Sequence, residues 1–384
     1  MKDKTFSFSY PADSGLKGTD IHFYSGTPDL EAIFFNTDEK KSSQRLFVTD
    51  KTLASLPSVK KFSEKFTDSG DTSIPGITYA KRGTDILAVI GAGERFKTMD
   101  SILSIESVAI KNNFNRNCTF IAIGGGVMSD MVAFAASIFK RGVSVDFVPT
   151  TLLSMVDASI GGKTGVDFSN YKNMVGTFWP AGNLYVWSDF VKTLPENEFR
   201  SGLGEALKTA LLFNEEMLNL FRTEKDKVLA RDSEIIGKVI SECAKAKAII
   251  VEEDLREHGR RAFLNLGHTF GHALESVAGL GAITHGEAVM WGIGRALDLS
   301  VRLSLCTKEY AESCKTLFAD YGYDMNPVPE ALKSFGGDRV KSLIEAMRKD
   351  KKNQSSEIRL TLQKGLCDTV IQTASDSDIE AVLA

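Results

Sequence analysis

Three of the five histidines lie close together in a pattern that suits a metal ion. His268 and His272 are four positions apart in GHTFGHALESV, and His285 follows in HGE. On a helix, residues four apart share one face, and neutral imidazole is the commonest metal ligand. The spacing alone predicts His268 and His272 as the ligand pair, with Glu205 or Glu275 supplying an oxygen. Histidines that only cap and pack a helix are the alternative.

A glycine triplet could bring the backbone close to a phosphate group. Gly124, Gly125 and Gly126 follow the apolar run TFIAI and precede a helical pattern that contains Asp130. Glycine allows close backbone approach, and a helix N-terminus offers N–H groups to an anion. The triplet predicts a dinucleotide site, although a tight strand-to-helix turn would use the same residues.

A second glycine-rich segment contains lysines. Lys163 lies within GGKTG at 161–165, and Lys172 and Asn173 follow closely. Lysine beside glycines can hold a phosphate as a point charge. The spacing of a P-loop is missing, and a solvated loop is the alternative. The cations Lys247, Arg260 and Arg261 and the run RKDKK at 348–352 are more often solvated faces than ligand contacts.

The elements that must position these residues change in kind along the chain. Short apolar runs at 45–49, 85–90, 119–123 and 144–148 predict buried strands, and 98–112 has helical periodicity. After about residue 187, helical patterns dominate at 198–213, 235–251, 286–305 and 342–348, with a strand-like run at 357–362. We therefore expect an α/β domain over residues 1–187 and a mostly helical domain over residues 188–384. Residues 1–44 cannot be assigned from their pattern.

Composition excludes several classes of function. The 384 residues have a net charge of −4, which argues against a general binder of nucleic acid or of acidic membranes. The five cysteines are scattered without a CxxC pair, which is typical of free thiols in a reducing compartment. No signal-peptide pattern and no apolar run long enough for a membrane span are visible. We expect a cytoplasmic protein.

Taken together, the motifs resemble those of the 3-dehydroquinate synthase family, in order and at similar separations from about residue 45 to 362. The matching blocks are VTDKTL, GAGERFKTMDSI, IAIGGGVMSDMVAFAASIFKRG, VPTTLLSMVDASIGGKTGVD, YKNMVGTFWP, SGLGEALKTALL, LNLGHTFGHALE, HGEAV and DKK…IRL. The resemblance implies a Rossmann-like NAD-binding α/β domain followed by a helical metal-binding domain. It also implies a homodimer.

The resemblance assigns roles to individual residues. It implies metal ligands Glu205, His268 and His285, which moves His272 to the substrate, and zinc or cobalt as the metal. For NAD it implies Asp50, Glu94, Lys97, Gly125, Gly126, Asp130, Thr150, Thr151, Lys163 and Lys172. For catalysis it implies Asp157, Lys163, Lys208, Lys247, Arg261, Asn265 and His272. For the substrate and its phosphate it implies Arg141, Lys163, Lys172, Asn173 and Lys351, with Lys352 as the alternative to Lys351. Arg141 is expected to reach a neighbouring subunit's site.

The implied reaction converts 3-deoxy-D-arabino-heptulosonate 7-phosphate to 3-dehydroquinate. It involves transient oxidation by NAD, phosphate elimination, re-reduction and an intramolecular aldol closure. One alternative is a sister sugar-phosphate cyclase, whose substrate lacks a carboxylate for Arg261 and Lys247 to bind. Another is a metal- and NAD-dependent polyol dehydrogenase, which has no phosphate to expel. The chain departs from the family pattern at Ser129, Asp167 and Trp179–Pro180. Asp167, where asparagine is common, could weaken binding at the phosphate loop.

Overall fold

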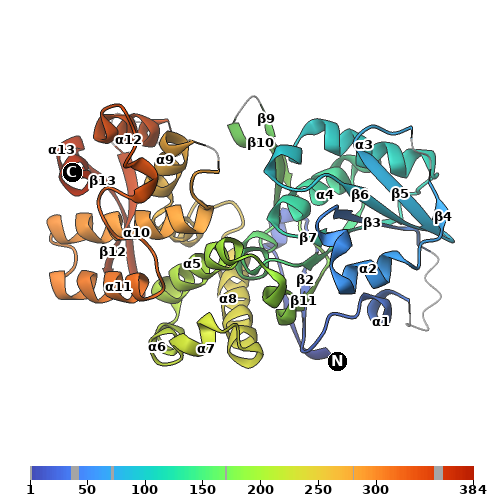
Figure 1. Cartoon of the computed structure of the whole chain (residues 1–384), viewed down its shortest axis with the longest axis horizontal. Helices are drawn as coiled ribbons and strands as arrows, with labels where there is room; N and C mark the ends of the chain where they lie inside the picture. The colour runs from blue at the N-terminus through green and yellow to red at the C-terminus, as the bar shows by residue number, and fades with distance from the viewer. Residues whose placement is uncertain (1, 36–42, 71–72, 169–170, 280, 350–357) are drawn as a thin grey trace. The chain divides into compact units, whose positions relative to one another are not determined.

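The computed structural model describes residues 2–35, 43–70, 73–168, 171–279, 281–349 and 358–384 (Figure 1). The chain divides into two compact units, one of Met1–Leu194 with Lys247–Leu255 and one of Pro195–Ala246 with Arg256–Ala384. The division therefore falls after Leu194, beyond the boundary expected at 187/188. Residues Ser188–Thr193 form a 3₁₀ helix that buries Phe190 and Val191, so this segment stays with the first unit.

The first unit is built on a sheet that has nine strands among the described residues. From one edge to the other these are β1 (Lys2–Phe8), β2 (Thr19–Tyr24), β11 (Asn183–Trp187), β8 (Ser144–Pro149), β7 (Thr119–Gly124), β3 (Arg45–Asp50), β6 (Asp85–Ile90), β5 (Ile77–Arg82) and β4 (Asp68–Ser69). The strands from β2 through β6 in this order run parallel. The outer pairs are antiparallel.

The apolar runs of the sequence become the centre of this sheet. The four predicted strands are β3, β6, β7 and β8, and their apolar residues are buried because parallel strands are covered on both faces. The unassigned residues 1–44 contain β1, the edge strand, and β2, which buries Thr19, Ile21 and Tyr24. The α/β class expected for this half is confirmed.

Helices and a hairpin complete the first unit. The helices are α1 (Leu30–Phe34), α2 (Pro57–Ser63), α3 (Met99–Lys111) and α4 (Gly126–Ile138), and α3 packs against α4 alongside the sheet (Figure 1). The hairpin is formed by β9 (Lys163–Phe168) and β10 (Tyr171–Phe178), and β9 packs against α4.

The second unit is mostly helical, as expected. Its helices are α5 (Glu196–Phe213), α6 (Glu215–Thr223), α7 (Lys225–Leu229), most of α8 (Ser233–Glu253), α9 (His268–Ala278), α10 (His285–Arg302), α11 (Lys308–Asp320), α12 (Arg339–Arg348) and α13 (Asp376–Leu383). The strand predicted at 357–362 is β12 (Ile358–Gly365), which pairs with β13 (Asp368–Ala374), a strand that the pattern did not reveal. None of the helices in the described residues has the length and hydropathy to cross a membrane.

Candidate active site

In the first unit, the predicted nucleotide residues follow the carboxyl ends of neighbouring parallel strands. Asp50 ends β3, Glu94 begins the turn after β6, and Thr150 follows β8. In parallel α/β sheets, ligands bind at this edge. Among the described residues, the buried Thr150 hydroxyl has no hydrogen-bond partner, so it is available to a ligand. Burial raises the pKa of the Glu94 carboxyl, and the positive charge of Lys97 opposes that shift.

The glycine triplet forms the turn from β7 into α4, and close packing requires glycine there. A Cβ on Gly124 would lie 2.5 Å from the Met128 Cβ, and one on Gly125 would lie 2.9 Å from the Thr151 Cγ2. The N-cap residue of α4 is Gly125, which has no side chain to cap the helix. The triplet therefore forms a tight strand-to-helix turn. The turn also presents backbone N–H groups of α4 at the same sheet edge, so a tight turn and a dinucleotide site are compatible interpretations of the triplet.

Lys97 is the centre of a polar network in the first unit. Its Nζ donates to Asp130 Oδ2 at 2.6 Å and to Asn173 Oδ1 at 2.5 Å. Burial disfavours the ammonium charge, but the neighbouring carboxylates outweigh burial and raise the pKa of Lys97. Burial raises the pKa of the Asp130 carboxyl, and Lys97 opposes that shift. The network places Asn173, on the β9–β10 hairpin, next to Asp130 on α4.

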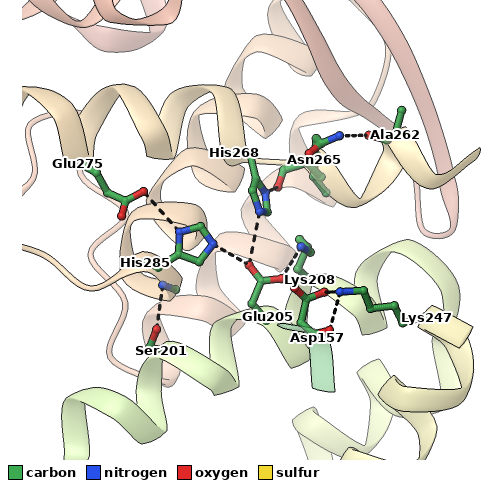
Figure 2. Close-up of polar contacts among 12 residues, drawn as sticks. Asp157, Ser201, Glu205, Lys208, Lys247, Ala262, Asn265, His268, Glu275 and His285 are labelled. Carbon is green, nitrogen blue, oxygen red and sulfur yellow. Dashed lines mark hydrogen bonds and ion pairs between the residues drawn. The ribbon is translucent and has the colours of Figure 1, made fainter. Parts of the chain in front are cut away.

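A second buried cation in this unit is Lys247, in the C-terminal half of α8. Its Nζ donates to Oδ1 and to the backbone carbonyl of Asp157, each at 2.6 Å (Figure 2). Only 8% of the Lys247 side chain is exposed, compared with 26% of Asp157. The two residues were predicted independently from the sequence, and the structure shows that they form an ion pair.

The remaining predicted phosphate contacts lie at the surface or outside the described residues. Lys163 and Lys172 are exposed on β9 and β10. Arg141 is also exposed and has a left-handed backbone, with φ of 70°. Lys351 and its alternative Lys352 fall outside the described residues.

In the second unit, small residues let two helices approach closely enough to join distant side chains. A Cβ on Gly286 of α10 would lie 2.0 Å from the Ser201 carbonyl oxygen of α5. A Cβ on Gly204 would lie 2.9 Å from the Gly286 carbonyl oxygen. The backbone N–H of Gly286 donates to Ser201 Oγ at 3.1 Å. This contact sets His285, the first residue of α10, against Glu205 of α5.

Glu205 faces two imidazole rings (Figure 2). Its Oε1 lies 3.8 Å from His268 Nε2 and 3.7 Å from His285 Nε2. Glu205 is fully buried, and its Oε2 forms an ion pair with Lys208 Nζ, whereas its Oε1, which faces the imidazoles, has no hydrogen-bond partner within the described parts of the chain. Two ligand atoms about 2.1 Å from a tetrahedral metal ion lie roughly 3.4 Å apart, close to the separations seen here. The three residues can therefore hold a divalent cation.

Two groups of three possible ligands occur among the described residues, and neither of them pairs His268 with His272, the pair that spacing suggested. The ligand atoms of Glu205, His268 and His285 lie within 4.8 Å of one another, and so do those of His272, Glu275 and His285. His268 and His272 share neither group, although their ring centroids are 5.3 Å apart. The i, i+4 argument compared residues of α9 alone, whereas Glu205 and His285, which face His268, belong to α5 and α10.

Arg261 is buried, with 1% of its surface exposed, and lies in the 3₁₀ segment Arg260–Asn265. Its Nε is 3.7 Å from Glu257 Oε1. Sequence reasoning missed Glu257, because it lies in a non-helical bend with φ of 61°, where the helical i, i+4 rule gives no signal. Asn265 is held by a 3.1 Å hydrogen bond from its Nδ2 to the Ala262 carbonyl.

Comparisons with known proteins identify a family for the chain. A family model described as 3-dehydroquinate synthase N-terminal matches residues 87–201, and one described as 3-dehydroquinate synthase C-terminal matches residues 202–353. A 3-dehydroquinate synthase of Psychrobacter cryohalolentis is 38% identical over 290 residues, covering 76% of each chain.

Solved structures share the fold. A 2-deoxy-scyllo-inosose synthase complexed with carbaglucose-6-phosphate, NAD⁺ and Co²⁺ is 21% identical, with a TM-score of 0.79 and 99% of each chain covered. A 2-epi-5-epi-valiolone synthase from Streptomyces hygroscopicus subsp. jinggangensis with NAD⁺ and Zn²⁺ bound is 26% identical, with a TM-score of 0.78. That match covers 96% of this chain and 97% of the other.

Proposed function

The chain belongs to the 3-dehydroquinate synthase family, and we propose that it converts 3-deoxy-D-arabino-heptulosonate 7-phosphate to 3-dehydroquinate and inorganic phosphate. The observation that carries the proposal is the buried Glu205 carboxylate facing His268 and His285. One carboxylate and two imidazoles leave positions open on a metal ion for substrate oxygens, as a catalytic site requires.

We propose Glu205, His268 and His285 as the ligands of zinc or cobalt, and NAD as the second cofactor. The bound groups named for the related cyclases support this pairing. When bound, the metal supplies a Lewis acid and NAD⁺ supplies a temporary hydride acceptor. The residues proposed to contact NAD are Asp50, Glu94, Lys97, Gly125, Gly126, Asp130, Thr150, Thr151, Lys163 and Lys172.

The substrate carries a phosphate and a carboxylate, and we assign a separate set of polar side chains to each. Lys163, Lys172, Asn173, Arg141 and the lysine of the DKK block would bind the phosphate and stabilise its negative charge as it leaves. The buried Arg261 guanidinium, with Lys247, would bind the carboxylate, a planar group that arginine can hold through two hydrogen bonds.

Polar side chains near these cations would orient the substrate and move protons. Asp157, whose carboxylate accepts from Lys247, and His272 on the exposed side of α9 are proposed for proton transfer. Lys208 and Asn265 are proposed to position the ring hydroxyls, because a lysine supplies donors and an amide supplies both donors and an acceptor.

A sister cyclase and a polyol dehydrogenase are the alternatives. The buried Arg261 is paired with the Glu257 carboxylate and could exchange it for a carboxylate of the substrate. The substrate of a sister cyclase has no carboxylate, so this arginine favours the dehydroquinate synthase reaction. Lys163, Lys172 and Asn173 are proposed to bind the leaving phosphate. A polyol dehydrogenase releases no phosphate, so this group argues against that alternative.

The homodimer and the cytoplasmic location also remain proposals. Leu103 and Ile110 of α3 and Ile138 of α4 are large apolar side chains with 56%, 63% and 43% of their surface exposed. Exposed apolar side chains of this kind are ones that a second copy of the chain would cover in a homodimer.

The test is incubation of the metal-loaded protein and NAD⁺ with the heptulosonate phosphate, followed by phosphate release and NADH absorbance. Catalytic phosphate release without accumulation of NADH is expected, because the cofactor is regenerated in each turnover. Stoichiometric NADH would favour the dehydrogenase, and turnover only with a carboxylate-free sugar phosphate would favour the sister cyclase.

A further inference from the structure

Both proposed histidine ligands present the same ring nitrogen to Glu205 and have a polar oxygen behind the other. His268 directs Nε2 toward Glu205, while its Nδ1 lies 3.2 Å from the Leu266 carbonyl oxygen. His285 also directs Nε2 toward Glu205, while its Nδ1 lies 3.4 Å from Glu275 Oε2 (Figure 2). One ring is thus backed by the main chain and the other by a carboxylate.

We propose that Glu275 is a positioning residue for the metal centre. By accepting the Nδ1–H of His285, its carboxylate fixes the tautomer that leaves the Nε2 lone pair toward Glu205. It also limits rotation of the ring and makes the imidazole a stronger ligand. The inference rests on the proposed function, because it requires that Glu205, His268 and His285 bind the metal.

The partner of His285 Nδ1 comes from another helix, because the polar residues next to His285 have a different task. His285 is the first residue of α10, and these neighbours cap the N-terminus of that helix. Thr284 and Glu287 form a capping box, in which Glu287 N donates to Thr284 Oγ1 at 3.4 Å and the backbone N–H of Thr284 donates to Glu287 Oε2 at 3.3 Å.

The environments of the two side chains agree with this role. The His285 side chain is 32% exposed and would gain from a partner that restricts its rotation. Glu275 comes from the neighbouring helix α9 and is only 15% exposed, so its carboxylate is held near the ring. Partial burial of a carboxylate costs free energy, and the Nδ1–H donor offsets part of that cost.

A second metal ion held by His272, Glu275 and His285 is the competing explanation, because their ligand atoms also lie within 4.8 Å of one another. A neutral imidazole carries one N–H and one lone pair. If Nε2 binds a metal, Nδ1 holds the proton, so His285 can serve both metals only by losing it. The hydrogen bond to Glu275 needs no such deprotonation.

The experiment compares Glu275→Ala and Glu275→Gln with the wild type as purified metal-free proteins. Glu312→Gln is the matched control, since Glu312 lies exposed on α11 and pairs with Lys315. Zn²⁺ affinity is measured by competition with a chelator, zinc stoichiometry is measured directly, and the visible spectrum of the Co²⁺-loaded proteins reports ligand geometry. Thermal melting of the metal-free proteins shows whether each variant folds.

We expect one metal per chain in all proteins. Zn²⁺ affinity should fall about 10- to 100-fold in Glu275→Ala, with an altered Co²⁺ spectrum. The fall should be smaller in Glu275→Gln, which keeps a neutral acceptor, and absent in Glu312→Gln. Unchanged affinity in a folded Glu275→Ala or Glu275→Gln would overturn the role of Glu275. Two metals in the wild type and one in the variants would make Glu275 a ligand instead. A wild type that binds no metal would overturn the proposed function, and with it this inference.

Discussion

Asp167 accepts a hydrogen bond of 2.8 Å, through its Oδ1, from the backbone N–H of Asn173. Asn173 has a left-handed backbone with φ of 54°, and its side chain accepts from Lys97. The backbone N–H of Asp167 in turn donates to the Lys97 carbonyl oxygen at 2.9 Å. Asp167 therefore closes a ring of contacts that holds the hairpin residue Asn173 against Lys97.

Replacement of Asp167 by alanine should loosen this ring. We expect kcat/KM for the phosphate substrate to fall about tenfold, which corresponds to about 1.4 kcal/mol, because the loss of a hydrogen bond to a charged group costs roughly that much. Asp167→Asn keeps an acceptor at this position and should retain most of the activity. Equal activity of Asp167→Ala and wild type would show that the hairpin is held by its other contacts.

Removal of the metal should abolish turnover. Chelation is expected to eliminate activity, and added zinc or cobalt should restore it. Glu205→Gln should show the same loss without restoration, because a neutral amide is a poor metal ligand. Glu198→Gln, an exposed position on the same helix, is the control and should keep wild-type activity. Full activity in a rigorously metal-free preparation would refute the metal site.

Arg261→Lys tests recognition of the substrate carboxylate. The guanidinium can form two parallel hydrogen bonds that an ammonium cannot reproduce. We expect the variant to lose about 1.5–3 kcal/mol of binding to the heptulosonate phosphate, with little change in NAD affinity or metal content. Arg260→Lys, at the adjacent exposed arginine, should behave as wild type. If Arg261→Lys keeps wild-type kcat/KM, a carboxylate-free sugar phosphate becomes the better substrate candidate.

Glu106 on α3 should make stability depend on pH. Burial raises the pKa of its carboxyl to about 7 from 4.5, and within the described residues its Oε1 has no hydrogen-bond partner. Below about pH 4.5 the carboxyl is protonated in both the folded and unfolded states. Between 4.5 and 7 the folded state binds more protons, so the free energy of unfolding falls as pH rises.

Glu106→Gln removes this titration. We expect the variant to be more stable than wild type by about 1–2 kcal/mol at pH 8 and nearly equal to it at pH 5, as measured by urea unfolding. The pH 5 measurement serves as the internal control. A stability difference that is the same at both pH values would contradict an elevated pKa at Glu106.

Local patterns were sufficient for the centre of the first unit. The apolar runs of β3, β6, β7 and β8 appear as strands because both faces of a parallel sheet are buried, so each run carries its own signal. Strands β1 and β2 were missed because they carry polar residues between their apolar ones, so neither contains an apolar run. The first unit extends to Leu194 because the buried Phe190 and Val191, rather than a change in composition, decide where packing ends.

The amino-acid sequence by itself determined which residue types are available for chemistry, and its ordered motifs determined the family. Helical spacing paired His268 with His272, since periodicity can compare only residues on one element. Tertiary structure decided that Glu205 and His285, from α5 and α10, meet instead. That contact depends on Gly204, Gly286 and Ser201, whose small size lets the two helices touch. Tertiary structure also places Glu275 next to His285 Nδ1. The distance between side chains on different helices depends on helix packing, which produces no periodic pattern in the sequence.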